Sequence, residues 1–256
     1  MAAPEPYDLL VHSGICATPA GLVVTDVAAR DGRIVAIGDL KGAPAAETFD
    51  ATGLHVLPGV IDSQVHFREP GAEHKEDLES GARGAALGGV TAVFEMPNTK
   101  PSTIDAAAIR DKLARAAGRM WVDHAFFVGA TGDNAEALAE AERLQGCAGT
   151  KIFMGASTGD LLVAEDDRLR NALNAVRRRV AVHCEDEARM RARKELAEAE
   201  AHPRAHPVWR DAESAVLATK RLLAIAKETA RRVHVLHVTT ADEAALLADW
   251  KDRATM

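Results

Sequence analysis

The sequence predicts an α/β fold in which a small β domain is followed by a (β/α)8 barrel of the TIM type. Beyond Pro58, short apolar strands alternate with Ala-rich helical stretches, and a strand–helix unit recurs roughly every 30 residues. Such units in unbroken series imply a parallel sheet covered by helices, which a barrel provides. The alternative is an open doubly wound sheet. No Gly-x-Gly-x-x-Gly or Walker pattern follows the first strand to support the nucleotide-binding form of that alternative.

The first 57 residues show a different pattern, short segments of alternating apolar and polar residues, which is typical of strands separated by tight turns. Gly and Asp turns such as Asp31-Gly32 separate short alternating segments at 8–12, 22–29 and 34–37. We therefore divide the chain into a small β domain, residues 1–57, and a barrel domain, residues 58–256.

The barrel domain contains six recognisable strands, each followed by a helical stretch. The strands are predicted at 60–66, 90–96, 122–129, 150–154, 180–183 and 233–238. The helices are predicted at 78–87, 104–117, 135–144, 166–178, 185–199 and 213–230, with a last one beginning near Ala241. The long interval before the sixth strand indicates one enlarged loop.

A closed barrel of this type needs eight strands. Residues 250–256 have the character of a helix or loop. We therefore expect an incomplete barrel of about six βα units, and a sequence that is a fragment of a longer gene product.

Composition excludes several classes of protein. The chain has 47% hydrophobic residues and a net charge of -7, so it can bury a core and offers no basic surface for nucleic acid. The N-terminus lacks the features of a signal peptide, and no apolar run reaches the roughly 18 residues of a membrane span. We expect a cytoplasmic protein with no nucleic-acid or membrane partner, in which Cys16, Cys147 and Cys184 are reduced and structural.

Four residues lie at or near predicted strand ends, on the face where a barrel keeps its active site. They are His66, Lys151, His183 and His237. Imidazole is a frequent ligand of zinc and similar ions, so histidines that converge on one rim indicate a metal centre. The other histidines are interpreted as structural or solvated, and so is the charge-rich stretch 185–204.

Lys151 is unusual because it stands inside an apolar strand. Burial disfavours a charged ammonium and lowers its pKa, which frees the amine as a nucleophile. Such an amine can react with carbon dioxide to form a carbamate whose oxygens can bridge two metal ions. The alternative is that the side chain reaches the surface or pairs with an acid.

Several motifs together resemble the cyclic amidohydrolases of the amidohydrolase superfamily, most closely dihydroorotase. The resemblance covers the whole sequence, with the first domain as the N-terminal part of the family's β-sandwich. The motifs are Asp31-Gly32-Arg33-Ile34, Asp50-Ala51-Thr52-Gly53, Leu57-Pro58-Gly59-Val60-Ile61-Asp62, His66-Phe67-Arg68-Glu69-Pro70-Gly71, Glu95-Met96-Pro97-Asn98-Thr99, His183-Cys184-Glu185-Asp186 and Leu236-His237-Val238-Thr239.

The resemblance implies one or two zinc ions held by His66, Lys151, His183 and His237. Lys151 would be carboxylated when it bridges two metals. The metal would activate water for attack on a ring amide. The family aspartate that moves the proton ends the eighth strand, which this sequence does not contain, so no catalytic residue is assigned.

Two further residues would read the substrate. Family members of the dihydroorotase type hold the substrate carboxylate with an arginine and an asparagine at the positions of Arg68 and Asn98. A guanidinium offers a planar fork of donors that matches a carboxylate. The alternative role for Arg68 is a salt bridge to Glu69 or Glu76.

Gln64 departs from the family pattern, which places a histidine two residues before His66. A carboxamide is a far weaker zinc ligand than imidazole. Three outcomes are open: one metal held by His183, His237 and a carboxylated Lys151; two metals with Gln64 as a weak ligand; or a metal-poor, silent site.

The resemblance implies a dihydroorotase-like hydrolase that interconverts carbamoyl aspartate and dihydroorotate in pyrimidine biosynthesis, with a carboxylate-bearing cyclic amide as substrate. One alternative is a ring hydrolase of the allantoinase or dihydropyrimidinase type. Another is a non-catalytic homologue that scaffolds aspartate transcarbamoylase. We also expect a homodimer or larger homo-oligomer.

Overall fold

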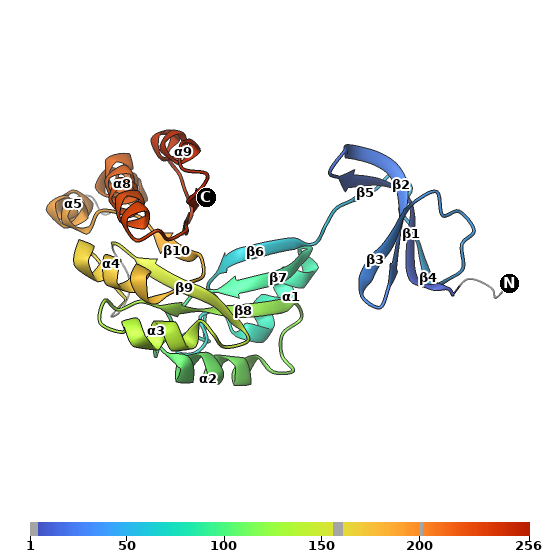
Figure 1. The fold of residues 1–256 in the computed structure, drawn as a ribbon, viewed down its shortest axis with the longest axis horizontal. Coiled ribbons are helices and arrows are strands. Elements are labelled where there is room, and N and C mark those ends of the chain that lie inside the picture. The colour runs from blue at the N-terminus through green and yellow to red at the C-terminus, as the bar shows by residue number, and fades with distance from the viewer. Residues whose placement is uncertain (1–4, 156–160, 200–201) are drawn as a thin grey trace. The chain divides into compact units, whose positions relative to one another are not determined.

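A computed structural model describes residues 5–155, 161–199 and 202–256. The chain divides into two compact units, Met1–Gly59 and Val60–Met256 (Figure 1). None of the helices within the described ranges is both long and apolar enough to cross a membrane.

The first unit is a five-stranded β-sheet with the order β3-β2-β1-β4, in which β5 also pairs with β1. The β2–β3 hairpin turns at Asp31 and Gly32, whose φ angles of 51° and 69° suit the tight turn of such a hairpin. The strands are β1 (Tyr7–Thr18), β2 (Gly21–Arg30), β3 (Arg33–Gly38), β4 (Ala45–Asp50) and β5 (His55–Val56).

The second unit is a curled sheet of seven parallel strands in strictly sequential order, β12-β11-β10-β9-β8-β7-β6. A doubly wound sheet would reverse its strand order, so the sequential order supports the barrel-like interpretation. The strands are β6 (Val60–Val65), β7 (Val90–Glu95), β8 (Asp123–Gly129), β9 (Cys147–Phe153), β10 (Val180–His183), β11 (Val233–Val235) and β12 (Ala254–Thr255).

Helices connect these strands, and several begin at an Asp or Thr that caps the first turn. Asp77, Asp105, Asp211 and Thr240 each accept a hydrogen bond from a backbone N–H of the helix that follows. The helices are α1 (Leu78–Leu87), α2 (Ala106–Ala116), α3 (Ala135–Ala141), α4 (Asp166–Ala175), α5 (Glu187–Ala192), α6 (Lys194–Ala199), the 3-10 turn η1 (Pro203–Ala205), α7 (His206–Trp209), α8 (Ala212–Glu228) and α9 (Ala241–Ala248).

The structure differs from the sequence-based expectation at several places, including β4 and β5, which were not predicted in the first domain. Residues 250–256 do not form only helix or loop, because Ala254 and Thr255 make β12, so seven parallel strands are present rather than six. The strand expected at 233–238 stops at Val235. The helix expected at 185–199 is interrupted at Arg193, which separates α5 from α6. Each difference lies where short runs of residues carry little periodicity.

The two faces of the parallel sheet pack differently. One face carries residues such as Phe126, Ile152 and Val182 and packs with the helices in the main hydrophobic core. The other face carries a smaller cluster of Met96, Phe127, Ala181 and Leu236. Successive side chains on a strand alternate between these faces, so one sequence supplies both.

A buried ion pair joins β7 to helix α2. The ammonium of Lys112 contacts the carboxylate of Glu95 and lies 3.3 Å from the carbonyl oxygen of Met96. Both residues are 1% exposed. Burial lowers the pKa of Lys112 and raises the pKa of Glu95 to about 7, although the pairing opposes both shifts. Each charge therefore depends on the other for its stability in the core.

Removing one partner of this pair should be costly. Lys112→Met leaves the Glu95 carboxylate buried without its cation, so we expect the free energy of unfolding at pH 8 to fall by about 3–5 kcal/mol. The double variant with Glu95→Leu should recover most of that loss. Urea unfolding followed by circular dichroism measures both. Arg110→Met, which removes an exposed pair 3.9 Å from Glu140, is the control and should change stability by less than about 1 kcal/mol. An equally mild effect of Lys112→Met would contradict the prediction.

Candidate metal centre and active site

The parallel sheet brings the carboxyl ends of its strands to one edge, and the predicted site residues gather there. His66 directly follows β6, Lys151 lies near the end of β9, and His183 is the last residue of β10. Asn98 lies in the loop after β7. His237 is two residues beyond β11 rather than within a strand, and its φ of 40° is in the left-handed region.

At the carboxyl end of β6, hydrogen bonds join the loop after β6 to the loop after β7. Nδ1 of His66 lies 2.8 Å from Oδ1 of Asn98. The backbone N–H of Lys100 also donates to the carbonyl oxygen of Pro70 at 2.9 Å. Partial burial and the nearby cation of Arg68 lower the pKa of His66, so its ring is neutral at pH 7. A neutral ring with Nδ1 engaged leaves Nε2 as the nitrogen free to bind a ligand.

Arg68 is exposed beside this contact, with a φ of 64°. Its alternative role as the partner of Glu69 is wrong, because Glu69 binds Arg119 instead. Both Glu69 oxygens accept from the Arg119 guanidinium, at 2.8 and 2.9 Å, and one also accepts from the backbone N–H of Leu78 at 3.0 Å. Within the described part of the chain, Arg68 forms no ion pair with Glu76 either. Its predicted role in reading a substrate carboxylate therefore stays a prediction.

Gln64 lies in β6 and is half-buried. The pairing of β6 with β7 shifts register between Asp62 and Val65, and the backbone N–H of Gln64 donates to the Asp62 carboxylate at 2.9 Å. Because β6 ends at Val65, regular alternation does not extend to His66. The expectation that the side chains of Gln64 and His66 share one side of the strand therefore stays a prediction.

Lys151 is the most unusual group at the edge. Its side chain is 1% exposed, and its Nζ has no hydrogen-bond partner among the described residues. The nearest aromatic contact is the ring of Phe153, whose centroid is 4.3 Å from Nζ. Burial lowers the pKa of Lys151 to about 7. The alternative of a surface lysine is therefore wrong, and within the described residues the amine has no acidic partner either.

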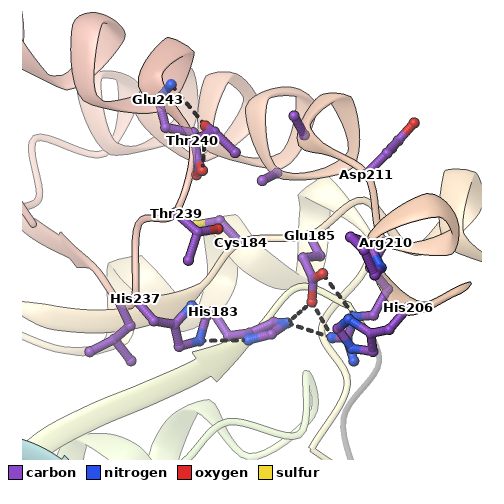
Figure 2. Close-up of a pocket in the computed structure, with 14 residues that line it drawn as sticks. His183, Cys184, Glu185, His206, Arg210, Asp211, His237, Thr239, Thr240 and Glu243 are labelled. Atoms are coloured by element: carbon purple, nitrogen blue, oxygen red, sulfur yellow. Dashed lines mark hydrogen bonds and ion pairs between the residues drawn. The ribbon is translucent and has the colours of Figure 1, made fainter. Parts of the chain in front are cut away.

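At the other end of the sheet edge, His183 and His237 meet. Nδ1 of His183 lies 2.9 Å from Nε2 of His237, and Nε2 of His183 lies 2.6 Å from a carboxylate oxygen of Glu185. The pKa of His237 is lowered to about 4 by desolvation and by the electrostatic effect of the neighbouring His183 and Lys151. Figure 2 shows Glu185 between His183 and Arg210, which also binds that carboxylate.

These histidines line a cavity of about 580 Å³. It is bounded by the ends of β10 and β11, by the loop before α8, and by the start of α9. The cavity is lined by His183, Cys184, Glu185, His206, Pro207, Arg210, Asp211, Ala212, Ala215, Leu236, His237, Thr239, Thr240 and Glu243.

Most of the lining residues were not predicted as part of the site, among them His206, Arg210 and Glu185. His206 and Arg210 belong to the enlarged loop between β10 and α8, and Glu185 lies in the stretch interpreted as solvated. Burial by itself raises the pKa of Glu185, but hydrogen bonds from His183 and Arg210 and the positive charge of Arg210 outweigh it and lower the pKa to about 2. The one available signal was the length of the loop, because long ordered loops in compact domains are often functional.

The predicted metal ligands form two groups rather than one. His183 and His237 are in contact, whereas His66 is held by Asn98. Among the residues with described positions, no three His, Cys, Asp or Glu side chains are spaced to hold a metal ion. The positive charge of Lys151 lowers the pKa of both His66 and His237, so the buried amine is electrostatically coupled to both groups.

Comparison with known proteins identifies related chains. A model of the amidohydrolase family matches residues 55–253. An allantoinase of Escherichia coli strain CFT073 is 36% identical over 250 residues, which cover 91% of this chain and 54% of the relative. An allantoinase of Escherichia coli strain HS is 35% identical with the same coverage.

Solved structures of hydantoinases are also similar to this chain. The L-hydantoinase (dihydropyrimidinase) from Arthrobacter aurescens is 28% identical, with a TM-score of 0.89 over 96% of this chain and 57% of that one. The D-hydantoinase from Bacillus sp. AR9 is 28% identical, with a TM-score of 0.81 over 95% of this chain and 55% of that one. The chain therefore spans about half the length of the relatives it matches.

The Glu69–Arg119 pair gives a pH-dependent prediction for the β6 loop. Hydrogen bonds from Arg119 lower the pKa of Glu69 below 4.5, against the opposing effect of burial. The stabilisation is therefore complete above about pH 4.5 and is lost as the pH falls through the lowered value. Glu69→Gln should reduce the free energy of unfolding at pH 7 by about 1–3 kcal/mol, and by less at pH 3.5.

Urea unfolding at the two pH values measures this difference. Glu140→Gln, which removes an exposed carboxylate 3.9 Å from Arg110, is the matched control and should give a small effect at both. A Glu69→Gln penalty that is the same at pH 3.5 and pH 7 would show that the carboxylate charge does not stabilise the loop.

Proposed function

The chain belongs to the amidohydrolase family, and on that premise we propose that the protein hydrolyses an amide bond within a cyclic substrate. In this reaction the oxygen of water bonds to a ring carbonyl carbon, the ring C–N bond breaks, and the nitrogen takes up a proton. The observation that carries the proposal is Lys151, a buried amine with no hydrogen-bond partner among the described residues, at the same sheet edge as His66, His183 and His237. Burying an amine without a partner costs free energy of folding. A buried group with a shifted pKa at such a position is therefore a candidate for a chemical role.

The donor set fits a zinc ion or a similar cation. The imidazole nitrogens of His183 and His237 would hold it together with a carbamate on Lys151, and His66 would serve a second cation, because the structure separates these histidines into two groups. The carbamate forms when the neutral amine attacks carbon dioxide, which makes an N–C bond and releases a proton. When bound, the metal would polarise the ring carbonyl and lower the pKa of water. One metal or two, and a part for Gln64, are both compatible with this proposal.

The relatives favour a neutral cyclic ureide as the substrate, because allantoinase and hydantoinase are the names they carry. This is the second function considered from the sequence, and it now takes precedence over the dihydroorotase-like one. The cavity beside His183 and His237 includes the hydroxyl of Thr239, which can donate to a C=O group or accept from an N–H group of a ureide ring. The carboxylate of Glu243 is already bonded to the hydroxyls of Thr219 and Thr240.

A substrate with a carboxylate, such as dihydroorotate, is the second candidate. It is supported by Arg68, whose exposed cation lies close enough to His66 to lower the pKa of that ring. Asn98 borders the same histidine through its amide oxygen, which leaves its amide N–H groups as donors. Arg68 and Asn98 therefore flank His66 as the predicted readers of a carboxylate.

A substrate panel tests the proposed reaction. We expect the zinc-loaded protein to open allantoin, hydantoin or dihydrouracil with a higher kcat/KM than dihydroorotate, measured by loss of ring absorbance and by chromatography. The reverse order would favour the second candidate. Absence of turnover on every substrate by a protein that binds zinc would support the non-catalytic scaffold instead, which a binding assay with aspartate transcarbamoylase would then examine.

Lys151 gives a direct test of the metal proposal. Lys151→Met removes the amine that would become a carbamate, so bound zinc measured by mass spectrometry of the metal should fall by at least one ion per chain. Lys220→Met, which changes an exposed lysine on α8, is the matched control and should retain the metal. Full zinc content in Lys151→Met would remove the carbamate from the mechanism.

Arg68 separates the two substrate classes. Arg68→Met should raise KM for dihydroorotate by about 10-fold or more, because a charge-assisted hydrogen bond is worth roughly 1.5–3 kcal/mol, and should leave KM for hydantoin nearly unchanged. Steady-state kinetics on both substrates measure the split. Equal changes in the two KM values would mean that Arg68 does not read a carboxylate.

A further inference from the structure

A continuous chain of contacts leads from the enlarged loop to His183. Nε of Arg210 donates to one oxygen of Glu185 at 2.8 Å, and an Nη2 donor contacts the other oxygen. That second oxygen lies 2.6 Å from Nε2 of His183. The three side chains are 19%, 16% and 13% exposed, so water competes little for these contacts. His183 is thus held on the side opposite to the nitrogen that meets His237 (Figure 2).

Arg210 is itself fixed by its neighbour Trp209. The guanidinium carbon of Arg210 lies 5.6 Å from the centroid of the Trp209 ring, within the range of a cation–π contact. The indole N–H of Trp209 donates to the carbonyl oxygen of Met190 at 2.8 Å, which anchors the ring on helix α5. The loop therefore delivers Arg210 in one defined position.

We propose that Glu185 and Arg210 are positioning residues for His183, which they hold with its Nδ1 lone pair directed toward the metal centre. A carboxylate at Nε2 favours the tautomer that carries its proton on Nε2, and that tautomer leaves Nδ1 unprotonated. The two-point contact with Arg210 fixes the plane of the Glu185 carboxylate and thereby the orientation of the His183 ring. The inference rests on the proposed function, since it assigns His183 as a metal ligand.

The contact between Arg210 and Glu185 restricts the rotation of the Glu185 carboxylate at the cavity wall. A single carboxylate beside His183 could rotate toward solvent or toward His206, another residue of that wall. Arg210 occupies both carboxylate oxygens and removes that freedom. The enlarged loop between β10 and α8 therefore contributes to the metal centre, although it carries none of the predicted ligands.

The tautomer of His183 can be measured without metal, so this test is independent of the proposed reaction. Nitrogen-15 NMR of the metal-free protein should show His183 protonated at Nε2 and unprotonated at Nδ1. In Glu185→Gln and in Arg210→Met we expect the fraction of the other tautomer to rise. A His183 ring protonated at Nδ1 in the unaltered protein, or a tautomer ratio that neither variant changes, would overturn the proposal.

Zinc affinity, measured by competition with a chromophoric chelator, provides the second test. Loss of an outer-shell partner typically weakens metal binding 10- to 100-fold, so we expect this range for Glu185→Gln and a loss near 10-fold for Arg210→Met. Arg210→Lys keeps the charge and one donor and should fall between Arg210→Met and the unaltered protein. Arg170→Met, which removes a comparable two-point contact with Glu228 on the protein surface, should bind zinc normally.

The outcomes separate the two proposals. If the unaltered protein binds zinc and the Glu185 and Arg210 variants bind it equally well, the positioning role fails and the proposed function stands. If the unaltered protein binds no zinc, the proposed metal centre fails, and the tautomer measurement still decides whether Glu185 and Arg210 orient His183. If Arg210→Lys binds zinc as weakly as Arg210→Met, then the two-point contact of the guanidinium with Glu185, rather than its charge, positions the His183 ring.

Discussion

The parallel register of β6 to β12 is the constraint on which the rest of the structure depends. Because every strand runs in the same direction, residues far apart in sequence reach one edge of the sheet together. Ala181 on β10 lies beside Lys151 on β9, and His183 lies beside Phe153, two positions further on. A shift of one residue in this pairing would turn the side chain of Lys151 to the other face of the sheet, where the helices pack.

Two buried lysines show how the same physical cost leads to different roles. Lys112 faces the helices and finds the carboxylate of Glu95, so its charge is neutralised within the core. Lys151 faces the opposite side and has no hydrogen-bond partner in the described structure, so burial lowers its pKa toward neutrality. The first residue joins a strand to a helix, whereas the second is an amine that needs a chemical explanation.

Part of the candidate site was predictable because Lys151 and His183 belong to regular strands and His66 directly follows one. Apolar runs that end in His66 and His183 mark the sheet edge in the sequence itself, and Lys151 stands out against its apolar neighbours. His237 was placed in a strand that ends before it, and β12 was missed because a two-residue strand carries no periodic signal. Arg210 and His206 could not be placed, because the path of a long loop depends on tertiary contacts such as Trp209 with Met190. The names of the relatives, allantoinase and hydantoinase, also differ from the dihydroorotase type that the motifs suggested.

Residues of the candidate site come from two sources, the parallel strands and the enlarged loop between β10 and α8. Replacing a residue on a strand disturbs the core and the strand register, so few replacements are tolerated there. Arg210 and His206 reach the cavity from outside the sheet, where replacements disturb the core least. Under the proposed positioning role, a replacement of Arg210 would nevertheless change the orientation of His183, so only the remainder of this loop is free to vary.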